Sequence, residues 1–278
     1  MPEAFFTGSG ESFEPSELTR GPWDRNSQHA GPPTALIARA IERLPADEPR
    51  QVGRITFEIL RPVPIAPLRV EAEIARPGRR VEMVEARLGD DEGDMVRARG
   101  WRLRVGDEQV PPELTAVGGP GDPGFGASTL RPGHTPPPPA AGEPRPFFAT
   151  GEDVGYHTGM EYRFVSGAFL APGPAVVWMR MIHPLVAGEE PTPLQRVLAA
   201  ADSGNGVSAA LDVSRWLFIN VDLTVHLQRM PVGEWVCLDA ITIAEREGIG
   251  ISDTALYDES GPIGRACQTL LVGQRGDA

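Results

Sequence analysis

The sequence contains few of the residues that would indicate a disulfide-rich or metal-binding protein. Among 278 residues there are two cysteines, Cys237 and Cys267, which form neither a CxxC pair nor a group with histidines. Disulfides and a structural zinc site are therefore not expected. His157, His183 and His226 are scattered along the chain, so we expect no metal and no other cofactor.

Long apolar runs and an excess of basic residues are also missing. No stretch approaches the ~18 uninterrupted apolar residues of a membrane-spanning helix, and the first residues (MPEAFFTGSGESFE) lack the features of a signal peptide. The 26 basic residues are outnumbered by 38 acidic ones, which gives a net charge of -12, whereas non-specific nucleic-acid binding requires clustered Lys and Arg. We therefore expect a cytoplasmic protein with no membrane span and no nucleic-acid partner.

A proline- and glycine-rich stretch divides the chain. It contains PPEL, GGPGDPGFG and TPPPPAAGEPRP, and has little apolar periodicity. This composition is typical of an extended linker. We predict an N-terminal domain at residues 1–105, a linker at residues 106–151 and a C-terminal domain at residues 152–278.

The same order of elements is predicted on both sides of the linker. Each half has a helix candidate that opens with proline, at residues 32–44 and 193–211. Four strand candidates follow each helix, at residues 54–60, 68–75, 80–88 and 95–105 and again at residues 217–227, 235–244, 248–257 and 263–272.

The last strands of the two halves show that the unit is duplicated. GDMVRARGWRL from Gly93 and GPIGRACQTLL from Gly261 share four residue types at an offset of 261 − 93 = 168, and Leu68 matches Trp235 at 167. Repetition at this spacing indicates a duplicated domain. One helix followed by an antiparallel meander predicts an α+β fold, in which a curved sheet wraps around a central helix in each half.

Three segments carry a resemblance to a known family. They are LAAADSGNG around Asp202, FINVDLTVHL around Asn220 and IGRACQTLLVG around Gln268. In this order and spacing, the chain resembles the acyl-CoA thioesterase II (TesB-like) family of double hot-dog proteins, which have two tandem hot-dog domains. The resemblance implies hydrolysis of an acyl-CoA substrate to free acid and CoA. It also suggests pairing of such units into a homo-oligomer, with a monomer as the alternative.

The resemblance also implies which side chains hold the attacking water. In the family an aspartate, a serine or threonine and a glutamine do so, and these positions match Asp202, Asn220 and Gln268. Asn220 departs from the usual hydroxyl, but its amide still donates and accepts hydrogen bonds. Asp202 interrupts a small, apolar stretch in which an unpartnered carboxylate would be costly to bury. A solvent-facing break in the helix is the alternative.

Only the second half offers this set of residues. The position equivalent to Gln268 is Gly100 (268 − 168), and the one near Asp202 is Leu36 (202 − 166). We expect the oxyanion donor to be a backbone N–H at a helix start. Gly204 inside the predicted helix costs about 1 kcal/mol relative to alanine, which is explained either by close approach of the sheet or substrate or by a simple helix break.

The entry to the first helix supplies candidate substrate-binding residues. Its HAGPP run resembles the His-Gly-Gly-Pro-Pro run of the family, which would place Trp23, His29 and Gly31, together with Gly204 of the second half, along the acyl or CoA channel. Because CoA is negatively charged, a local basic patch is also expected. Its candidates are Arg76, Arg79 and Arg80 of ARPGRR, for which a solvated hairpin turn is the alternative.

Two other functions compete with hydrolysis. Asp24, Asn26 and His29 reproduce the D-x-N-x-x-H spacing of MaoC-like hot-dog enoyl-CoA hydratases, although Ser27 replaces the usual proline. A double hot-dog that binds acyl-CoA or another lipid without turnover is the third alternative. The sequence has no GxSxG nucleophile elbow, so hydrolysis should proceed without an acyl-enzyme.

Overall fold

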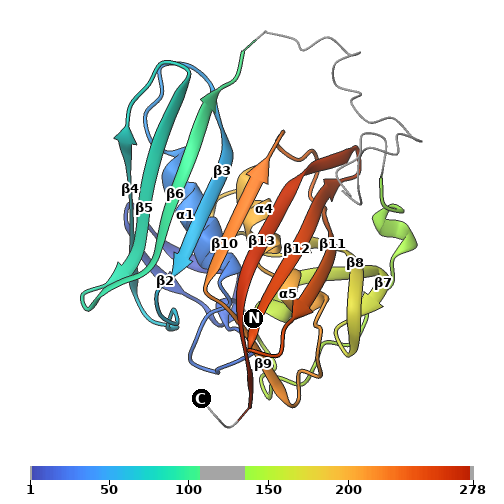
Figure 1. The fold of residues 1–278 in the computed structure, drawn as a ribbon. Coiled ribbons are helices and arrows are strands. Elements are labelled where there is room, and N and C mark those ends of the chain that lie inside the picture. The colour runs from blue at the N-terminus through green and yellow to red at the C-terminus, as the bar shows by residue number, and fades with distance from the viewer. Residues whose placement is uncertain (1, 107–134, 276–278) are drawn as a thin grey trace.

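A computed structural model describes residues 2–106 and 135–275 of the chain (Figure 1). The first half contains β1 (Phe6–Ser9), β2 (Ser12–Pro15), η1 (Glu17–Thr19), α1 (Gly31–Glu42), β3 (Arg50–Ile59), β4 (Leu68–Arg76), β5 (Val81–Asp90) and β6 (Gly93–Arg104). The second half contains η2 (Pro139–Ala141), α3 (Tyr156–Gly159), β7 (Met160–Ala168), β8 (Ala171–Met181), α4 (Pro193–Ala201), α5 (Gly204–Val207), β9 (Trp216–Asn220), β10 (Asp222–Leu227), β11 (Val236–Ala244), β12 (Ile249–Asp258) and β13 (Gly261–Gln274). No helix in these ranges is long and apolar enough to cross a membrane.

The described strands form one antiparallel sheet that runs through both halves. Their order is β1-β2-β4-β5-β6-β3-β10-β13-β12-β11-β8-β7, with β9 pairing to β13. The two halves meet where β3 pairs with β10. Helices α1 and α4 lie side by side on the inner face of this sheet (Figure 1). The arrangement is the curved sheet around central helices that the sequence predicts.

The strand register repeats at a constant offset of 168. Val84 pairs with Gly100 on β5 and β6, and Ser252 pairs with Gln268 on β12 and β13. The same offset relates Leu68 to Val236 rather than to Trp235, so the offset of 167 inferred from the sequence for that strand is wrong by one residue. The predicted strands are present, with ends shifted by up to four residues. β1, β2, β7 and β8, which have no counterpart among the eight strands located from the sequence, extend the sheet at its two ends.

The second helix is interrupted where the sequence predicts one helix at residues 193–211. α4 ends at Ala201, Asp202 is its C-cap, and α5 begins at Gly204. A Cβ atom on Gly204 would lie 2.5 Å from Oγ1 of Thr254. Glycine is therefore required for the chain to pass this close to β12. The glycine marks both a close approach to the sheet and a break in the helix, which are the two explanations that the sequence offered.

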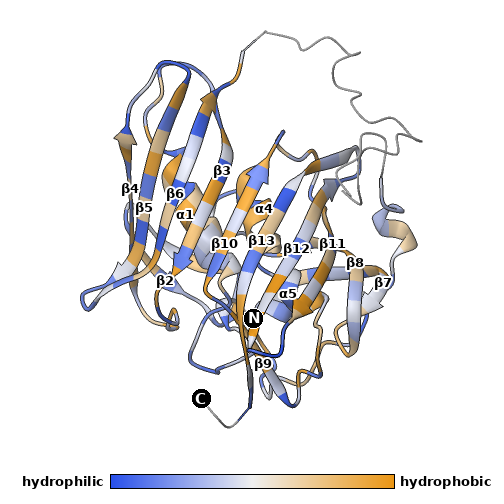
Figure 2. Cartoon of the chain, in the orientation of Figure 1, coloured by the Kyte–Doolittle hydropathy of each residue, from blue (hydrophilic) through white to orange (hydrophobic). Residues whose placement is uncertain are grey.

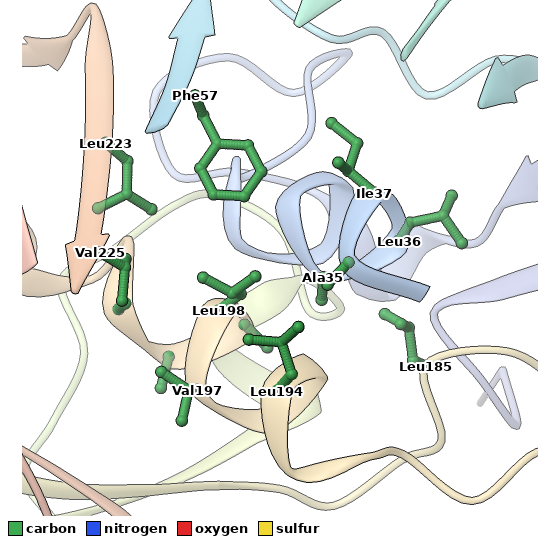
Figure 3. Packing of buried hydrophobic residues seen from close by; sticks show 14 of the residues in the cluster. Ala35, Leu36, Ile37, Phe57, Leu185, Leu194, Val197, Leu198, Leu223 and Val225 are labelled. Carbon is green, nitrogen blue, oxygen red and sulfur yellow. The ribbon is translucent and has the colours of Figure 1, made fainter. Parts of the chain in front are cut away.

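A hydrophobic core fills the space between the helices and the sheet (Figure 3). Figure 2 shows apolar and polar residues alternating along the strands around it. The core joins residues from both halves, including Leu36 and Ile37 of α1, Leu198 of α4, Phe57 of β3 and Val225 of β10. The two halves therefore share one buried core across the helix pair.

Small residues allow the two helices to approach closely. A Cβ atom on Gly31 would lie 2.4 Å from the backbone oxygen of Ala199, and Oγ1 of Thr34 donates a hydrogen bond to the Leu198 carbonyl (3.3 Å). This contact sets the first turn of α1 against the last turn of α4, which is where the candidate site lies.

Part of the predicted linker packs against the second half. The Pro137 carbonyl accepts a hydrogen bond from Nε1 of Trp178 on β8 (2.7 Å), and Glu143 forms a β-bridge with Phe164 of β7. Residues 107–134 of that linker lie outside the described residues. The predicted domain boundaries stay predictions.

Arg102 ties β6 to the end of α1 and is itself buried. Its Nε donates to Glu82 (2.6 Å), and its guanidinium also donates to the carbonyls of Ile41, Leu44 and Pro45 at 3.0 to 3.2 Å. The arginine therefore satisfies carbonyls that the helix end leaves open, in addition to neutralising a buried carboxylate.

Replacing this arginine should destabilise the fold strongly. Arg102→Gln should lower the free energy of unfolding by about 3 kcal/mol, because Glu82 stays buried without its closer cation and three carbonyls lose a donor. Arg99→Gln is the matched control, since Arg99 pairs with Glu85 on the exposed face of β6, where a pair contributes less than about 1 kcal/mol. Urea unfolding of both variants measures this, and equal losses would contradict the assignment.

Candidate active site

A buried carboxylate, Asp202, lies directly after α4 and is 4% exposed. Its Oδ1 atom accepts hydrogen bonds from the side-chain amides of Asn220 (2.8 Å) and Gln268 (3.2 Å). Its Oδ2 atom lies 3.1 Å from Nδ1 of His29. The structure therefore brings together the three residues that the resemblance assigns to water binding, and adds His29 from the first half.

Both amides are held by further contacts. Nε2 of Gln268 also donates to the backbone carbonyl of Asp202 (3.1 Å), and its Oε1 accepts the N–H of Asn205 (3.2 Å). Nδ2 of Asn220 also donates to the Asp222 carbonyl (3.3 Å). These contacts turn the N–H groups of both side chains toward the carboxylate, so that Asp202 is buried with donors around one of its oxygens.

A break between two strands positions Asn220. The sequence predicts one strand at residues 217–227, but β9 ends at Asn220 and β10 begins at Asp222. Asn220 pairs with Leu270 of β13, and Gln268 lies two residues earlier on that strand. Because side chains alternate along a strand, Gln268 and Leu270 point to the same inner face.

His29 reaches Asp202 from the loop before α1. Its ring stacks on Tyr156, with centroids 3.8 Å apart, and its Nδ1 accepts the backbone N–H of Gly31 (3.0 Å). The Tyr156 hydroxyl donates to the Ala199 carbonyl (2.5 Å) and lies 3.0 Å from Oγ of Ser203. Burial lowers the pKa of His29 from its ordinary value of 6.5, and the neighbouring Asp202 charge raises it in part.

Sequence reasoning missed several buried polar residues beside this group. Tyr156 has no sequence signal, since it lies in a four-residue helix far from the matched motifs. Ser252 faces the same interior next to Gly204 and is 1% exposed, and its hydroxyl has no hydrogen-bond partner within the described part of the chain. Alternation in GISDT of β12 places Ser252 and Thr254 inward and was the one available signal.

The residues of the hydratase alternative do not come together. The Asp24 carboxylate is exposed and accepts hydrogen bonds from the Asn26 N–H (2.7 Å) and the Ser27 hydroxyl (3.2 Å) in its own turn. The carboxylate beside His29 belongs to Asp202 instead. Asp24 therefore stabilises the loop as a side-chain turn.

Trp23 lies beside the site without contacting Asp202. It stacks on Phe148 at 5.9 Å and packs with the cluster that contains Phe218 of β9 and Leu270 of β13. Phe218 lies two residues before Asn220, and Leu270 lies two residues after Gln268. Asn220 and Gln268 are the two side chains that donate to Asp202. Trp23 thus forms part of an apolar wall next to the carboxylate group.

The arginines proposed for CoA binding lie near the start of β3, whereas Asn220 lies near its end. Arg76, Arg79 and Arg80 surround the turn between β4 and β5, where Arg50 donates to the Gly78 carbonyl (2.9 Å). From there β3 runs to Ile59, whose N–H donates to the Val221 carbonyl beside Asn220. Nine residues of strand span roughly 30 Å. The hairpin-turn explanation therefore fits these arginines better.

The first half has no equivalent set. At the offset of 168, Asn220, Ser252 and Gln268 correspond to Val52, Val84 and Gly100.

When α1 and α4 are aligned at their first residues, Gly31 and Pro193, the offset is 193 − 31 = 162. By this alignment Asp202 corresponds to Ala40 rather than to Leu36. The neighbouring Arg39 is buried and makes two hydrogen bonds to Glu189 (2.6 and 2.7 Å). This ion pair joins α1 to the segment before α4. Within residues 2–106 and 135–275, no cluster of three His, Cys, Asp or Glu side chains could hold a metal ion.

Comparison with known proteins identifies the family of the chain. Residues 19–103 match the sequence model of an acyl-CoA thioesterase N-terminal domain, and residues 132–272 match that of an acyl-CoA thioesterase C-terminal domain. No curated protein matches the chain.

Solved structures share the fold at low sequence identity. A thioesterase II of Thermobifida fusca superposes with a TM-score of 0.72 at 16% identity, covering 98% of this chain and 96% of its own. A thioesterase of Novosphingobium aromaticivorans gives 0.66 at 16% identity, with 96% and 98% covered. The TesB protein of Mycobacterium avium subspecies paratuberculosis gives 0.65 at 15% identity, with 96% and 95% covered. The two domain matches together span most of the chain, which therefore belongs to the acyl-CoA thioesterase family and is a TesB-like thioesterase with a double hot-dog fold.

Proposed function

We propose that the protein hydrolyses acyl-CoA to free acid and CoA, with Asp202 as the base that activates water. The observation that carries this proposal is the unequal use of the two carboxylate oxygens. Oδ1 is occupied by the amides of Asn220 and Gln268, whereas Oδ2 faces His29 and receives no amide N–H from the described residues. A carboxylate held in this way keeps one oxygen free to take a proton.

In this mechanism Oδ2 of Asp202 removes a proton as the water oxygen attacks the thioester carbonyl carbon. The tetrahedral intermediate then collapses, the C–S bond breaks, and the proton on Asp202 passes to the departing thiolate. Gln268 and Asn220 keep the carboxylate oriented throughout. No covalent bond to the protein forms, in agreement with the absence of a GxSxG elbow.

We assign the oxyanion to the backbone N–H of Gly31. This group opens α1, points toward the site at His29, and lies where the helix dipole favours negative charge. The next two residues, Pro32 and Pro33, have no N–H. Gly31 is therefore the first-turn donor nearest to Asp202 that substrate can use once His29 shifts away from it.

The apolar wall formed by Trp23, Phe218 and Leu270 is our candidate for the acyl or pantetheine contact. It lies beside the strands that hold Asn220 and Gln268, so a chain lying along it would present its carbonyl to the carboxylate. Gly204 packs closely against β12, because a Cβ atom there would lie 2.5 Å from Oγ1 of Thr254. A cytoplasmic location stays a prediction.

Loss of the base should abolish hydrolysis without unfolding the protein. Asp202→Asn keeps the shape of the side chain but removes its basicity, so kcat/KM for acyl-CoA should fall by about 10²-fold or more. Free-thiol release from a panel of short to long acyl-CoAs measures this, with thermal melting as the check on folding.

Asp24→Asn is the matched control, because Asp24 only caps an exposed turn. It should leave thiol release within about twofold of wild type, as expected for a surface change. If Asp202→Asn releases thiol as fast as wild type, or if Asp24→Asn loses thiol release to the same extent as Asp202→Asn, the assignment of the base is wrong.

Protonation of His29 should lower the rate of hydrolysis at acidic pH. Because burial lowers its pKa below 6.5, His29 is neutral at pH 7, and it gains a proton only at lower pH. The resulting imidazolium would bind Oδ2 and withdraw that oxygen from the attacking water. The wild-type kcat/KM should therefore hold down to about pH 6.5 and then fall.

His29→Gln cannot acquire this positive charge, so the fall in rate should move to lower pH. Rate profiles between about pH 4.5 and 8 for both proteins measure this. A midpoint above 6.5 in wild type, or the same midpoint in both proteins, would contradict this role of His29.

A further inference from the structure

Two arginines are neighbours where β13 ends and β9 begins, close to the C-terminus of the chain (Figure 1). The backbone N–H of Arg275 donates to the carbonyl of Arg215 (3.0 Å), and both residues are exposed. Neither guanidinium forms an ion pair with another described residue. The nearby Asp212 carboxylate instead accepts hydrogen bonds from the N–H and the hydroxyl of Ser214 (2.8 and 2.7 Å). Two unpaired guanidinium groups on adjacent strands can bind an anion such as a phosphate.

Contacts on one side of Arg275 hold its side chain in place. Its guanidinium carbon lies 5.2 Å from the centre of the Trp23 ring, which is a cation–π contact. Its Nε atom donates to the Val213 carbonyl (2.8 Å). The two terminal nitrogens have no hydrogen-bond partner among the described residues. This arginine is therefore already oriented, with donors left for a ligand.

The paired strands β9 and β13 connect these arginines to the catalytic group. We call their three successive residue pairs the β9–β13 ladder, and in order they are Asn220–Leu270, Phe218–Val272 and Trp216–Gln274. Phe218, Leu270 and Val272 are buried, and Trp23 packs against the cluster that they form. The ladder is thus largely apolar, with Asn220 beside Asp202 at one end and the two arginines at the other.

The length of the ladder matches the pantetheine arm of CoA. Asn220 and Arg215 are five residues apart (220 − 215), which corresponds to roughly 17 Å of strand. A pantetheine arm has about 13 bonds between its sulfur and the first phosphorus, and at about 3.3 to 3.6 Å for every three bonds it reaches roughly 15 Å. A thioester held at Asp202 therefore places the diphosphate of CoA beside the arginines.

The first half has the opposite pattern at the equivalent positions. Arg50 pairs with Arg104 there, as Phe218 pairs with Val272 in the second half at the offset of 168. The sequence counterparts of the two unpaired arginines are both acidic, namely Asp47 and Asp107. An apolar ladder that ends in two cations is therefore specific to the half that contains Asp202.

We propose that Arg215 and Arg275 bind the phosphates of the CoA nucleotide while the pantetheine arm lies along the β9–β13 ladder. The inference rests on the proposed hydrolysis of acyl-CoA and adds the place where the nucleotide binds. It assigns the wall of Trp23, Phe218 and Leu270 to pantetheine rather than to the acyl chain. Because the chain has a net charge of -12, these local cations are needed to offset the repulsion of a phosphorylated substrate.

The test compares two thioesters of the same acid, acyl-CoA and acyl-pantetheine, because the second keeps the arm but has no phosphate. Wild type should have the lower KM for acyl-CoA. The double variant Arg215→Gln with Arg275→Gln should raise the KM for acyl-CoA by about tenfold, as expected for the loss of two exposed ion pairs. Its KM for acyl-pantetheine and its kcat for both thioesters should stay within about twofold of wild type. Thermal melting shows that the variant is folded.

Arg79→Gln with Arg80→Gln is the matched control, because it removes two exposed positive charges from the turn between β4 and β5. It should leave both KM values within about twofold of wild type, as expected for surface changes. The proposal is wrong if the folded double variant of Arg215 and Arg275 raises both KM values equally or leaves the KM for acyl-CoA unchanged. It is equally wrong if the control raises that KM as much.

Failure of the proposed hydrolysis would look different, because wild type would then release thiol from neither thioester. Titration calorimetry with CoA alone tests the two arginines in that case. Binding of CoA that is about tenfold weaker in the Arg215 and Arg275 variant than in wild type and the control would support the site. No binding to wild type, or equal binding to all three proteins, would overturn it.

Discussion

The close contact between α1 and α4 is the constraint on which the site depends. Gly31 lies so near the Ala199 carbonyl that no side chain fits between them. This contact places the start of one helix against the end of the other, and it therefore places His29 of the first half 3.1 Å from Asp202 of the second. Neither half alone contains the complete group, because His29 comes from the first half and Asp202 from the second. The two halves also share one core and one sheet.

The buried carboxylate would be unfavourable without its surroundings. Burial of an ionised group must be offset by hydrogen bonds and nearby charge, and Asp202 receives two amide N–H groups on a single oxygen. In the first half the equivalent strand positions carry Val52 and Gly100, and the nearby helix holds the Arg39–Glu189 ion pair. The two halves are similar scaffolds, but among the described residues only the second has the amides that stabilise a buried carboxylate at these positions.

Much of the fold could be predicted from the sequence because strand alternation and the repeat at 168 are strong, local signals. The positions of Asp202, Asn220 and Gln268 followed from resemblance, and the structure brings these three side chains together. A break in the helix at Gly204 was one of two alternatives from the sequence. The sequence could not decide between them, because the outcome depends on how closely Gly204 approaches Thr254 across the interior. The stacking of Tyr156 on His29 was equally hidden, since the two residues are 127 positions apart (156 − 29) and join only when the sheet closes.

The central claim is that Asp202 activates water and does not attack the thioester itself. A single turnover in ¹⁸O-labelled water, with enzyme in excess over acyl-CoA, tests for an acyl-aspartate that water opens at the aspartyl carbon. Mass spectrometry of the protein quenched during that turnover tests for the acylated side chain itself, whichever carbon water attacks. Direct attack by water predicts that the first molecules of free acid carry one ¹⁸O atom from the solvent, while the protein stays unlabelled. Unlabelled acid from that first turnover, together with ¹⁸O in the side chain of Asp202, would show a covalent acyl-aspartate and would contradict the account.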